Sequence, residues 1–105
     1  MKPEARAAIG QLKEHYDHVL QSSHMRALFK EDPERFNSFS VELPEVELLF
    51  DYSKNIITAE TMVLLRSLME AAGVEGARAD MFSGALINTT EERAVLHVAL
   101  RHPDG

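Results

Sequence analysis

The chain has 105 residues, of which 45% are hydrophobic, enough for one small domain with a modest core. Its 11 basic and 17 acidic residues give a formal net charge of −6, which opposes non-specific binding to nucleic acid and to anionic membranes. The absence of cysteine excludes disulfides and thiolate chemistry, and no stretch suits a signal peptide or a membrane span. We therefore expect one soluble, cytoplasmic unit over residues 1–105, with no nucleic-acid or membrane partner.

The N-terminal part of the chain predicts helices. Over residues 3–20, Pro3 suits a first helical turn, and apolar side chains recur at spacings of three and four. The recurring positions are Ala8, Ile9, Leu12, Tyr16, Val19 and Leu20. A further turn or two is expected over residues 24–29, and Asp32 is expected to cap a short helix with Pro33 in its first turn.

Residues 39–52 predict a β-hairpin. Phe39, Val41 and Leu43 alternate with polar residues, residues 44–45 turn the chain, and the following stretch is rich in branched and aromatic side chains. A lone two-stranded hairpin is marginal in water, so this one should lie on helices or join a larger sheet.

A clear amphipathic helix follows the hairpin. Thr58 is its expected cap and Gly73 its terminator, and a shorter helix over residues 75–82 should end at Gly84. The apolar stripe of the first of these helices comprises Met62, Leu65, Leu68, Met69 and Ala72. The predicted fold class is mainly α with a β-hairpin, an α+β arrangement.

The last predicted element is the run RAVLHVALRH at residues 93–102. Between residues 94 and 100 only His97 is polar, so the run has no face suited to water and needs covering protein on all sides. Thr89 and Glu92 are spaced as a capping box, which favours a helix over a strand. We expect a buried helix in which His97 is a hydrogen-bonded core histidine rather than a catalytic base.

Five histidines raise the hypothesis of a metal site. His15 and His18 lie three apart on one helix, with Asp17 or His24 as a conceivable third ligand. A metal site needs ligands that converge from several elements, which this spacing does not provide. Solvated surface histidines are the preferred interpretation, and no metal is predicted.

Two further segments contain residue types that occur in catalytic sites. Ser53 and Lys54 resemble a nucleophile and its base, but adjacent strand residues point to opposite faces, so a structural role with Asn55 turning the chain is preferred. The MFSG segment at residues 81–84 lacks the glycines of a nucleophile elbow or a phosphate loop. The acidic pairs are interpreted as solvated or helix-start charge: Glu45 with Glu47, and Glu91 with Glu92. No catalytic, cofactor-binding or metal-binding residue is predicted.

Four segments in order carry a resemblance to a known family: HMRALFKEDPERFNSFS, LLFDYSKNIIT, ARADMFSG and INTTEERAVLHVALR. Together they resemble the N-terminal part of glucose-6-phosphate isomerase, also called phosphoglucose isomerase, over residues 12–101. The resemblance implies a homodimeric enzyme several times longer than this chain, built from αβα sandwich domains. Such enzymes interconvert glucose 6-phosphate and fructose 6-phosphate through an enediol, without a metal.

The resemblance assigns no active-site residue to this chain. The family's catalytic glutamate, histidine, arginine and lysine and its phosphate-binding loop lie beyond the matched region, and its Gly-Gly-Arg signature is absent. Glu60, His97, Lys54 and Arg93 are therefore not assigned to catalysis.

Residues 1–105 are interpreted as a scaffold fragment that is inactive alone, with the rest of the enzyme covering residues 94–100. The alternative is a non-enzymatic module that pairs with itself or with a full-length isomerase subunit through that run. Extracellular signalling roles of some family members find no supporting feature in this sequence.

Overall fold

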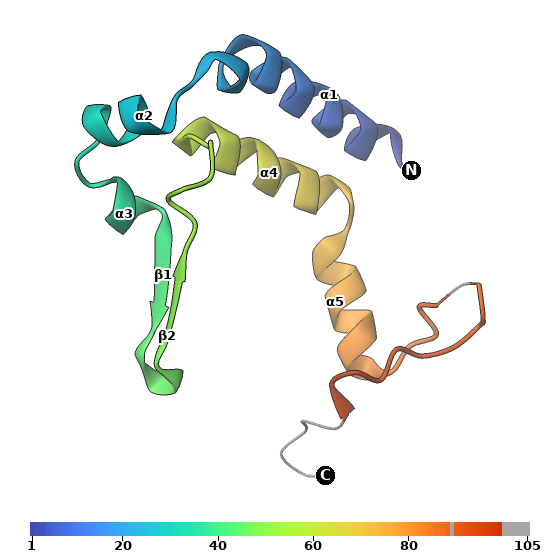
Figure 1. Ribbon diagram of the computed structural model, residues 1–105. Helices are drawn as coiled ribbons and strands as arrows, with labels where there is room; N and C mark the ends of the chain where they lie inside the picture. The colour runs from blue at the N-terminus through green and yellow to red at the C-terminus, as the bar shows by residue number, and fades with distance from the viewer. Residues whose placement is uncertain (89, 100–105) are drawn as a thin grey trace.

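A computed structural model describes residues 1–88 and 90–99 and consists mainly of helices with one antiparallel hairpin (Figure 1). In chain order the elements are α1 (Pro3–His18), the 3-10 turn η1 (Leu20–Ser22), α2 (Met25–Glu31), α3 (Arg35–Ser38), β1 (Ser40–Leu43), the 3-10 turn η2 (Pro44–Val46), β2 (Leu48–Asp51), α4 (Ala59–Ala71) and α5 (Val74–Ser83). The predicted fold class is confirmed. Across the described residues, no helix combines the length and the apolarity needed to cross a bilayer.

The main packing contact joins α1 to α4, which lie side by side (Figure 1). The buried side of α1 carries Ala5, Ala8 and His15, two of which are small enough to let the helix axes approach closely. The predicted stripe on α1 is therefore partly wrong, because Ile9 and Tyr16 are 42% and 52% exposed. Large side chains fit poorly in this close contact, so the helix turns its alanine column inward instead.

The apolar stripe predicted on α4 is also only partly buried. Leu65 and Met69 are 38% and 51% exposed, whereas Thr61 is 4% exposed at the contact with α1. Hydrophobic periodicity identified the helix but did not identify which of its sides meets α1.

The signals that begin and end α4 and α5 are confirmed. Thr58 and Thr61 form a reciprocal capping box at the start of α4. Gly73 and Gly84 follow the two helices with left-handed backbones, at φ of 73° and 80°, where a side chain would be strained. The start of the short helix α3 differs slightly from the prediction. The helix begins at Arg35 rather than Pro33, because Asp32 accepts a hydrogen bond from Glu34 N and forms a turn there.

The hairpin lies where it was predicted, with β1 and β2 paired in antiparallel register and η2 as the connection. Its inner end packs well: Phe39 is 6% exposed and meets Tyr52 edge to face at 5.9 Å. Its outer part extends away from α1 and α4 (Figure 1), and all four residues of β2 are exposed. Within the described residues the hairpin joins no larger sheet, and the expectation that it lies on helices holds only at the inner end, where Arg35 of α3 lies over the Phe39 ring.

The expectation of a buried helix over residues 93–102 is wrong for the residues described. Asn88 and Arg93 exchange backbone hydrogen bonds in an isolated bridge, and Glu92 has a left-handed backbone at φ 53°. Because the bridge engages both the N–H and the C=O of Arg93, these groups are not available to a helix. The left-handed backbone of Glu92 interrupts the helical path just before it. Leu96 is 60% exposed and His97 is exposed, so His97 is not a core histidine. Thr89 and residues 100–102 of the prediction lie outside the described residues.

Candidate functional site

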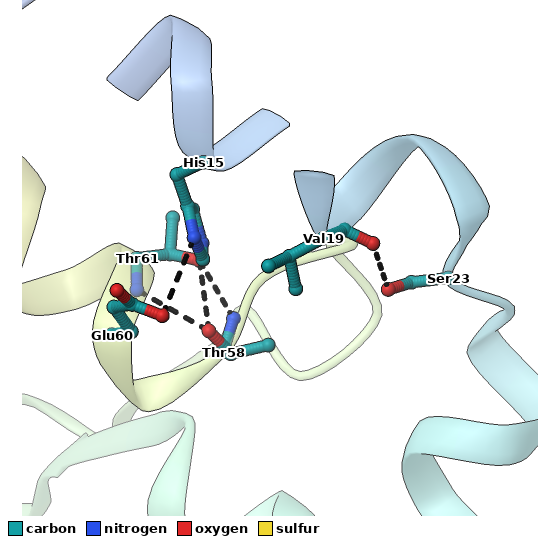
Figure 2. Close-up of polar contacts among 6 residues, drawn as sticks. All are labelled: His15, Val19, Ser23, Thr58, Glu60 and Thr61. Carbon is teal, nitrogen blue, oxygen red and sulfur yellow. Dashed lines mark hydrogen bonds and ion pairs between the residues drawn. The ribbon is translucent and has the colours of Figure 1, made fainter. Parts of the chain in front are cut away.

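A buried polar cluster joins α1 to the start of α4 (Figure 2). His15, which is 6% exposed, projects from α1 towards Thr58, Glu60 and Thr61. Its Nε2 lies 2.6 Å from Thr61 Oγ1, and its Nδ1 lies 3.5 Å from Glu60 Oε2. The prediction of a solvated surface histidine is therefore wrong for His15 and confirmed for the exposed His18.

The partners of His15 define its tautomer. A carboxylate at Glu60 favours a proton on the facing Nδ1, so Nε2 accepts the hydroxyl proton of Thr61. Thr61 Oγ1 in turn accepts from Thr58 N at 2.9 Å, and Thr61 N donates to Thr58 Oγ1 at 3.3 Å. The capping box of α4 and the imidazole of α1 thus form one continuous hydrogen-bonded network.

The order Thr61, His15, Glu60 is that of a nucleophile, a base and an acid that orients the base. Accessibility decides against this chemistry, because Thr61 is only 4% exposed and its hydroxyl is already engaged in the helix cap. Both nitrogens of His15 also face protein partners, which makes it a poor metal ligand. The cluster is a structural joint between two helices.

An open hollow of about 360 Å³ lies beside this joint. Its lining includes His15, His18, Glu14 and Glu60, together with apolar Val19 and Leu64. Among residues 1–88 and 90–99, no group of three or more His, Asp or Glu side chains is placed so that it could hold a metal ion. His24 occupies the N-cap position of α2 without a side-chain cap bond and lines a separate open hollow of about 490 Å³ with Arg26 and Lys30, so it does not complete a site with His15.

A second buried cluster centres on Arg35 of α3, which is only 2% exposed. Its Nε donates to Ser53 O at 2.8 Å, Nη2 to Asn55 O at 2.7 Å and Nη1 to Ile57 O at 3.0 Å. The guanidinium also lies 4.6 Å from the ring centroid of Phe39. One cation therefore holds three alternate carbonyls of the segment that leads from the hairpin into α4.

The DYSKN motif, residues 51–55, supplies the backbone that Arg35 holds. Ser53 N donates to Asp51 Oδ1 at 2.9 Å, and Asn55 Nδ2 donates to Tyr52 O at 3.2 Å. Hydrogen bonding by the Ser53 hydroxyl, and then by its backbone N–H, lowers the pKa of the Asp51 carboxyl below its ordinary value. The structural role predicted for Asn55 as a turn residue is confirmed.

The geometry around Ser53 differs from the expected strand. β2 ends at Asp51, so Ser53 and Lys54 lie in a turn, where Ser53 is buried and Lys54 is exposed. The two side chains therefore face different environments, as an argument from strand alternation also implied. In the MFSG segment, Ser83 donates to the carbonyl of Asp80 at the end of α5. The acidic pairs at positions 45, 47, 91 and 92 are exposed, as expected.

Sequence reasoning missed Arg35 and misplaced His15. The signal for His15 was its spacing, because positions 5, 8, 12 and 15 form one column at helical intervals and two of them are alanines. For Arg35, aromatic residues at positions 29 and 39 flank the cation in sequence, but its acceptors are backbone carbonyls 18 to 22 positions away. No local pattern shows such acceptors.

These clusters hold segments of the chain to one another, and comparison with known proteins identifies the family. The family model described as "Phosphoglucose isomerase" matches residues 51–105, beginning at the DYSKN motif. The chain belongs to the phosphoglucose isomerase family.

Curated relatives support this assignment over most of the chain. Glucose-6-phosphate isomerase 1 of Colwellia psychrerythraea is 56% identical over 81 residues, which are 77% of this chain and 14% of that protein. Glucose-6-phosphate isomerase of Brucella anthropi is 52% identical over 95 residues, 90% of this chain and 17% of that protein, and the Brucella ovis enzyme gives the same values. The chain thus spans less than a fifth of the length of the relatives that it matches.

Proposed function

We propose that residues 1–105 serve as part of the N-terminal scaffold of a glucose-6-phosphate isomerase. The whole enzyme would interconvert glucose 6-phosphate and fructose 6-phosphate by proton transfer through an enediol, in glycolysis and gluconeogenesis. It would act in the cytoplasm as a homodimer of αβα sandwich domains. The support is the family membership together with the names of the curated relatives.

The observation that carries the scaffold role is that the buried polar side chains have protein partners. Arg35 binds backbone carbonyls, and His15 binds Thr61 and faces Glu60. General acid-base catalysis needs a group that can reach a substrate proton. The polar atoms of Arg35 and His15 instead face other residues of this chain. A polypeptide limited to residues 1–105 should therefore have no isomerase activity.

A chimera tests the proposal. The matched segment of the Brucella anthropi isomerase is replaced by the corresponding residues of this chain, and turnover of fructose 6-phosphate is measured in a host whose own isomerase gene has been deleted. Retention of activity within about tenfold of the parent is expected, since the segment would preserve the scaffold without touching reacting atoms. A folded but inactive chimera would overturn the proposal, as would turnover by the 105-residue polypeptide alone.

The exposed apolar side chains favour a second candidate function, a non-enzymatic module that pairs with itself or with a full-length isomerase subunit. Phe50 is 61% exposed and Leu96 in the 94–100 run is 60% exposed. Sedimentation of the polypeptide alone and mixed with the Brucella isomerase distinguishes the two. A stable complex with the intact enzyme would favour the module.

A further inference from the structure

The contact between α1 and α4 contains a histidine with a polar partner at each ring nitrogen (Figure 2). We name His15, Thr58, Glu60 and Thr61 the His15 cluster. The ring is 6% exposed, with Nε2 at 2.6 Å from Thr61 Oγ1 and Nδ1 at 3.5 Å from Glu60 Oε2. Histidine is the side chain that ordinarily changes charge between about pH 5 and 8. A second proton on His15 therefore has to be accommodated by these two contacts.

The neutral ring satisfies the cluster in one arrangement. Its Nδ1–H faces the Glu60 carboxylate, so Nε2 accepts the hydroxyl proton of Thr61. Thr61 Oγ1 accepts a hydrogen bond from Thr58 N at 2.9 Å, and Thr58 Oγ1 accepts one from Thr61 N at 3.3 Å. The hydroxyl proton of Thr61 is thus the atom that joins the cap of α4 to the ring on α1.

The charged ring satisfies the cluster in a second arrangement. Nε2–H then donates to Thr61 Oγ1, which has two lone pairs and still accepts from Thr58 N. The hydroxyl proton of Thr61 has to turn to another acceptor, and Thr58 Oγ1 lies 3.2 Å away with either atom able to donate. Rotation of one hydroxyl therefore takes up the added proton while both helices stay in place.

Three further titratable side chains line the open hollow beside the ring: Glu14 and His18 from α1, and Glu60 from α4. Glu60 lies within ion-pair distance of Nδ1, and its carboxylate attracts a charged imidazole more strongly than a neutral one. The Glu60 side chain is 68% exposed, so water screens this attraction in part. His18 is exposed and also gains charge in acid, so it has to be separated from His15 by experiment.

We propose that the His15 cluster is a pH-sensitive contact that stays closed in both protonation states of His15 by reversing one hydrogen bond, and that Glu60 stabilises it more strongly once the ring is charged. The added contribution of Glu60 is complete below the ordinary histidine pKa of about 6.5 and is lost as pH rises above it. It also ends in stronger acid, near the ordinary glutamate pKa of about 4.3, where Glu60 itself loses its charge. The contact between α1 and α4 is then held most strongly in mild acid.

Nitrogen NMR of isotope-labelled histidine in the 105-residue chain tests the reversal of the hydrogen bond. At about pH 8, His15 should carry its proton on Nδ1 and none on Nε2. At about pH 5.5, both nitrogens should carry a proton, and nuclear Overhauser contacts between the ring and Thr61 should persist. A neutral ring protonated at Nε2, or loss of these contacts in mild acid, would overturn the proposal.

His15 and His18 supply matched backgrounds for a test of the role of Glu60. Both lie on α1 and line the same hollow, but His15 is buried and His18 is exposed. Glu60→Gln is introduced into the parent, into His15→Gln and into His18→Gln, both in the 105-residue chain and in the isomerase chimera. Loss of a first-turn carboxylate from α4 affects all three backgrounds alike at both pH values, so the comparison isolates the attraction to the ring.

In the parent and in His18→Gln, Glu60→Gln should lower the melting temperature by about 2–4 °C more at about pH 5.5 than at about pH 8. In His15→Gln, the effect should be the same at both pH values. An effect independent of pH in the parent would overturn the proposal, as would a pH dependence that survives in His15→Gln. If the 105-residue chain shows no thermal transition, the chimera supplies the measurement. An inactive chimera counts against the proposed function, whereas the melting data test the His15 cluster.

Discussion

Replacing Arg35 is the most direct test of how the chain is held together. Arg35→Met keeps an unbranched stem of similar reach but removes all three donors to the carbonyls of residues 53, 55 and 57. Arg35→Lys keeps the charge but replaces the planar fork with a single ammonium, which cannot reach three separated acceptors at once. The two variants therefore separate the contribution of the charge from that of the geometry.

The magnitude follows from burial. A hydrogen bond to a charged group is worth about 1.5–3 kcal/mol, and a buried carbonyl left without a donor costs about 1–3 kcal/mol. Only the bond to Ser53 O is fully buried, so water can replace the donors at Asn55 and Ile57 in part. We expect Arg35→Met to lower the free energy of unfolding by about 3–5 kcal/mol, and Arg35→Lys by about 1–2 kcal/mol.

Urea unfolding followed by far-UV circular dichroism measures these values. Arg78→Lys is the matched control, because Arg78 has a side chain that is 62% exposed and pairs with Glu75 on the surface of α5. Arg78→Lys should change the free energy of unfolding by no more than about 0.5 kcal/mol. If Arg35→Lys were as stable as Arg78→Lys, the argument from three directed hydrogen bonds would be refuted.

Three further outcomes are expected. Thr61→Val should lower the free energy of unfolding by about 1–3 kcal/mol in urea, because it leaves Thr58 N and the Nε2 of His15 without a partner; an unchanged unfolding midpoint would contradict a structural role for this cluster. Asp51 has a lowered pKa in the folded state, so its stabilising effect is complete above the ordinary carboxyl pKa of about 4 and is lost as pH falls through the lower folded value. Melting curves of Asp51→Asn and the parent should therefore differ at neutral pH and converge in acid, and a gap independent of pH would count against this. A chelator should leave the melting temperature unchanged, and a drop of several degrees would reveal a metal site.

Elements encoded by local chemistry were predictable from the sequence. The cap at Thr58 and the stops at Gly73 and Gly84 depend on the residue itself and its immediate neighbours, so the limits of α4 and α5 follow from the chain alone. The hairpin is similar, because alternation of apolar and polar residues marks its first strand and a stretch rich in branched and aromatic side chains marks its second.

The predictions that were wrong concern features that depend on contacts between distant residues or on competing local hydrogen bonds. Periodicity cannot show that α1 meets α4 through alanines, so Ile9 was placed inside although it is 42% exposed. The spacing of Thr89 and Glu92 favoured a helix over residues 93–102, but the bridge between Asn88 and Arg93 redirects the backbone before the apolar run begins. Asn88 Oδ1 also accepts from Glu91 N, one of the local side-chain bonds that compete with a helix start.

The start of α4 is where both buried clusters meet, and the DYSKN motif supplies backbone carbonyls to one of them. The hydrogen bonds of Arg35 to this segment all go to backbone carbonyls, so they do not depend directly on the side chains of the motif. Their effect is indirect: Asp51 and Asn55 bond within the turn and thereby set where its carbonyls point. Four positions after Ile57, Thr61 closes the helix cap onto His15 of α1. One short segment therefore fixes the direction of α4 from two sides, through carbonyls held by α3 and through a hydroxyl held by α1, and a change in either contact should be transmitted to the helix as a whole.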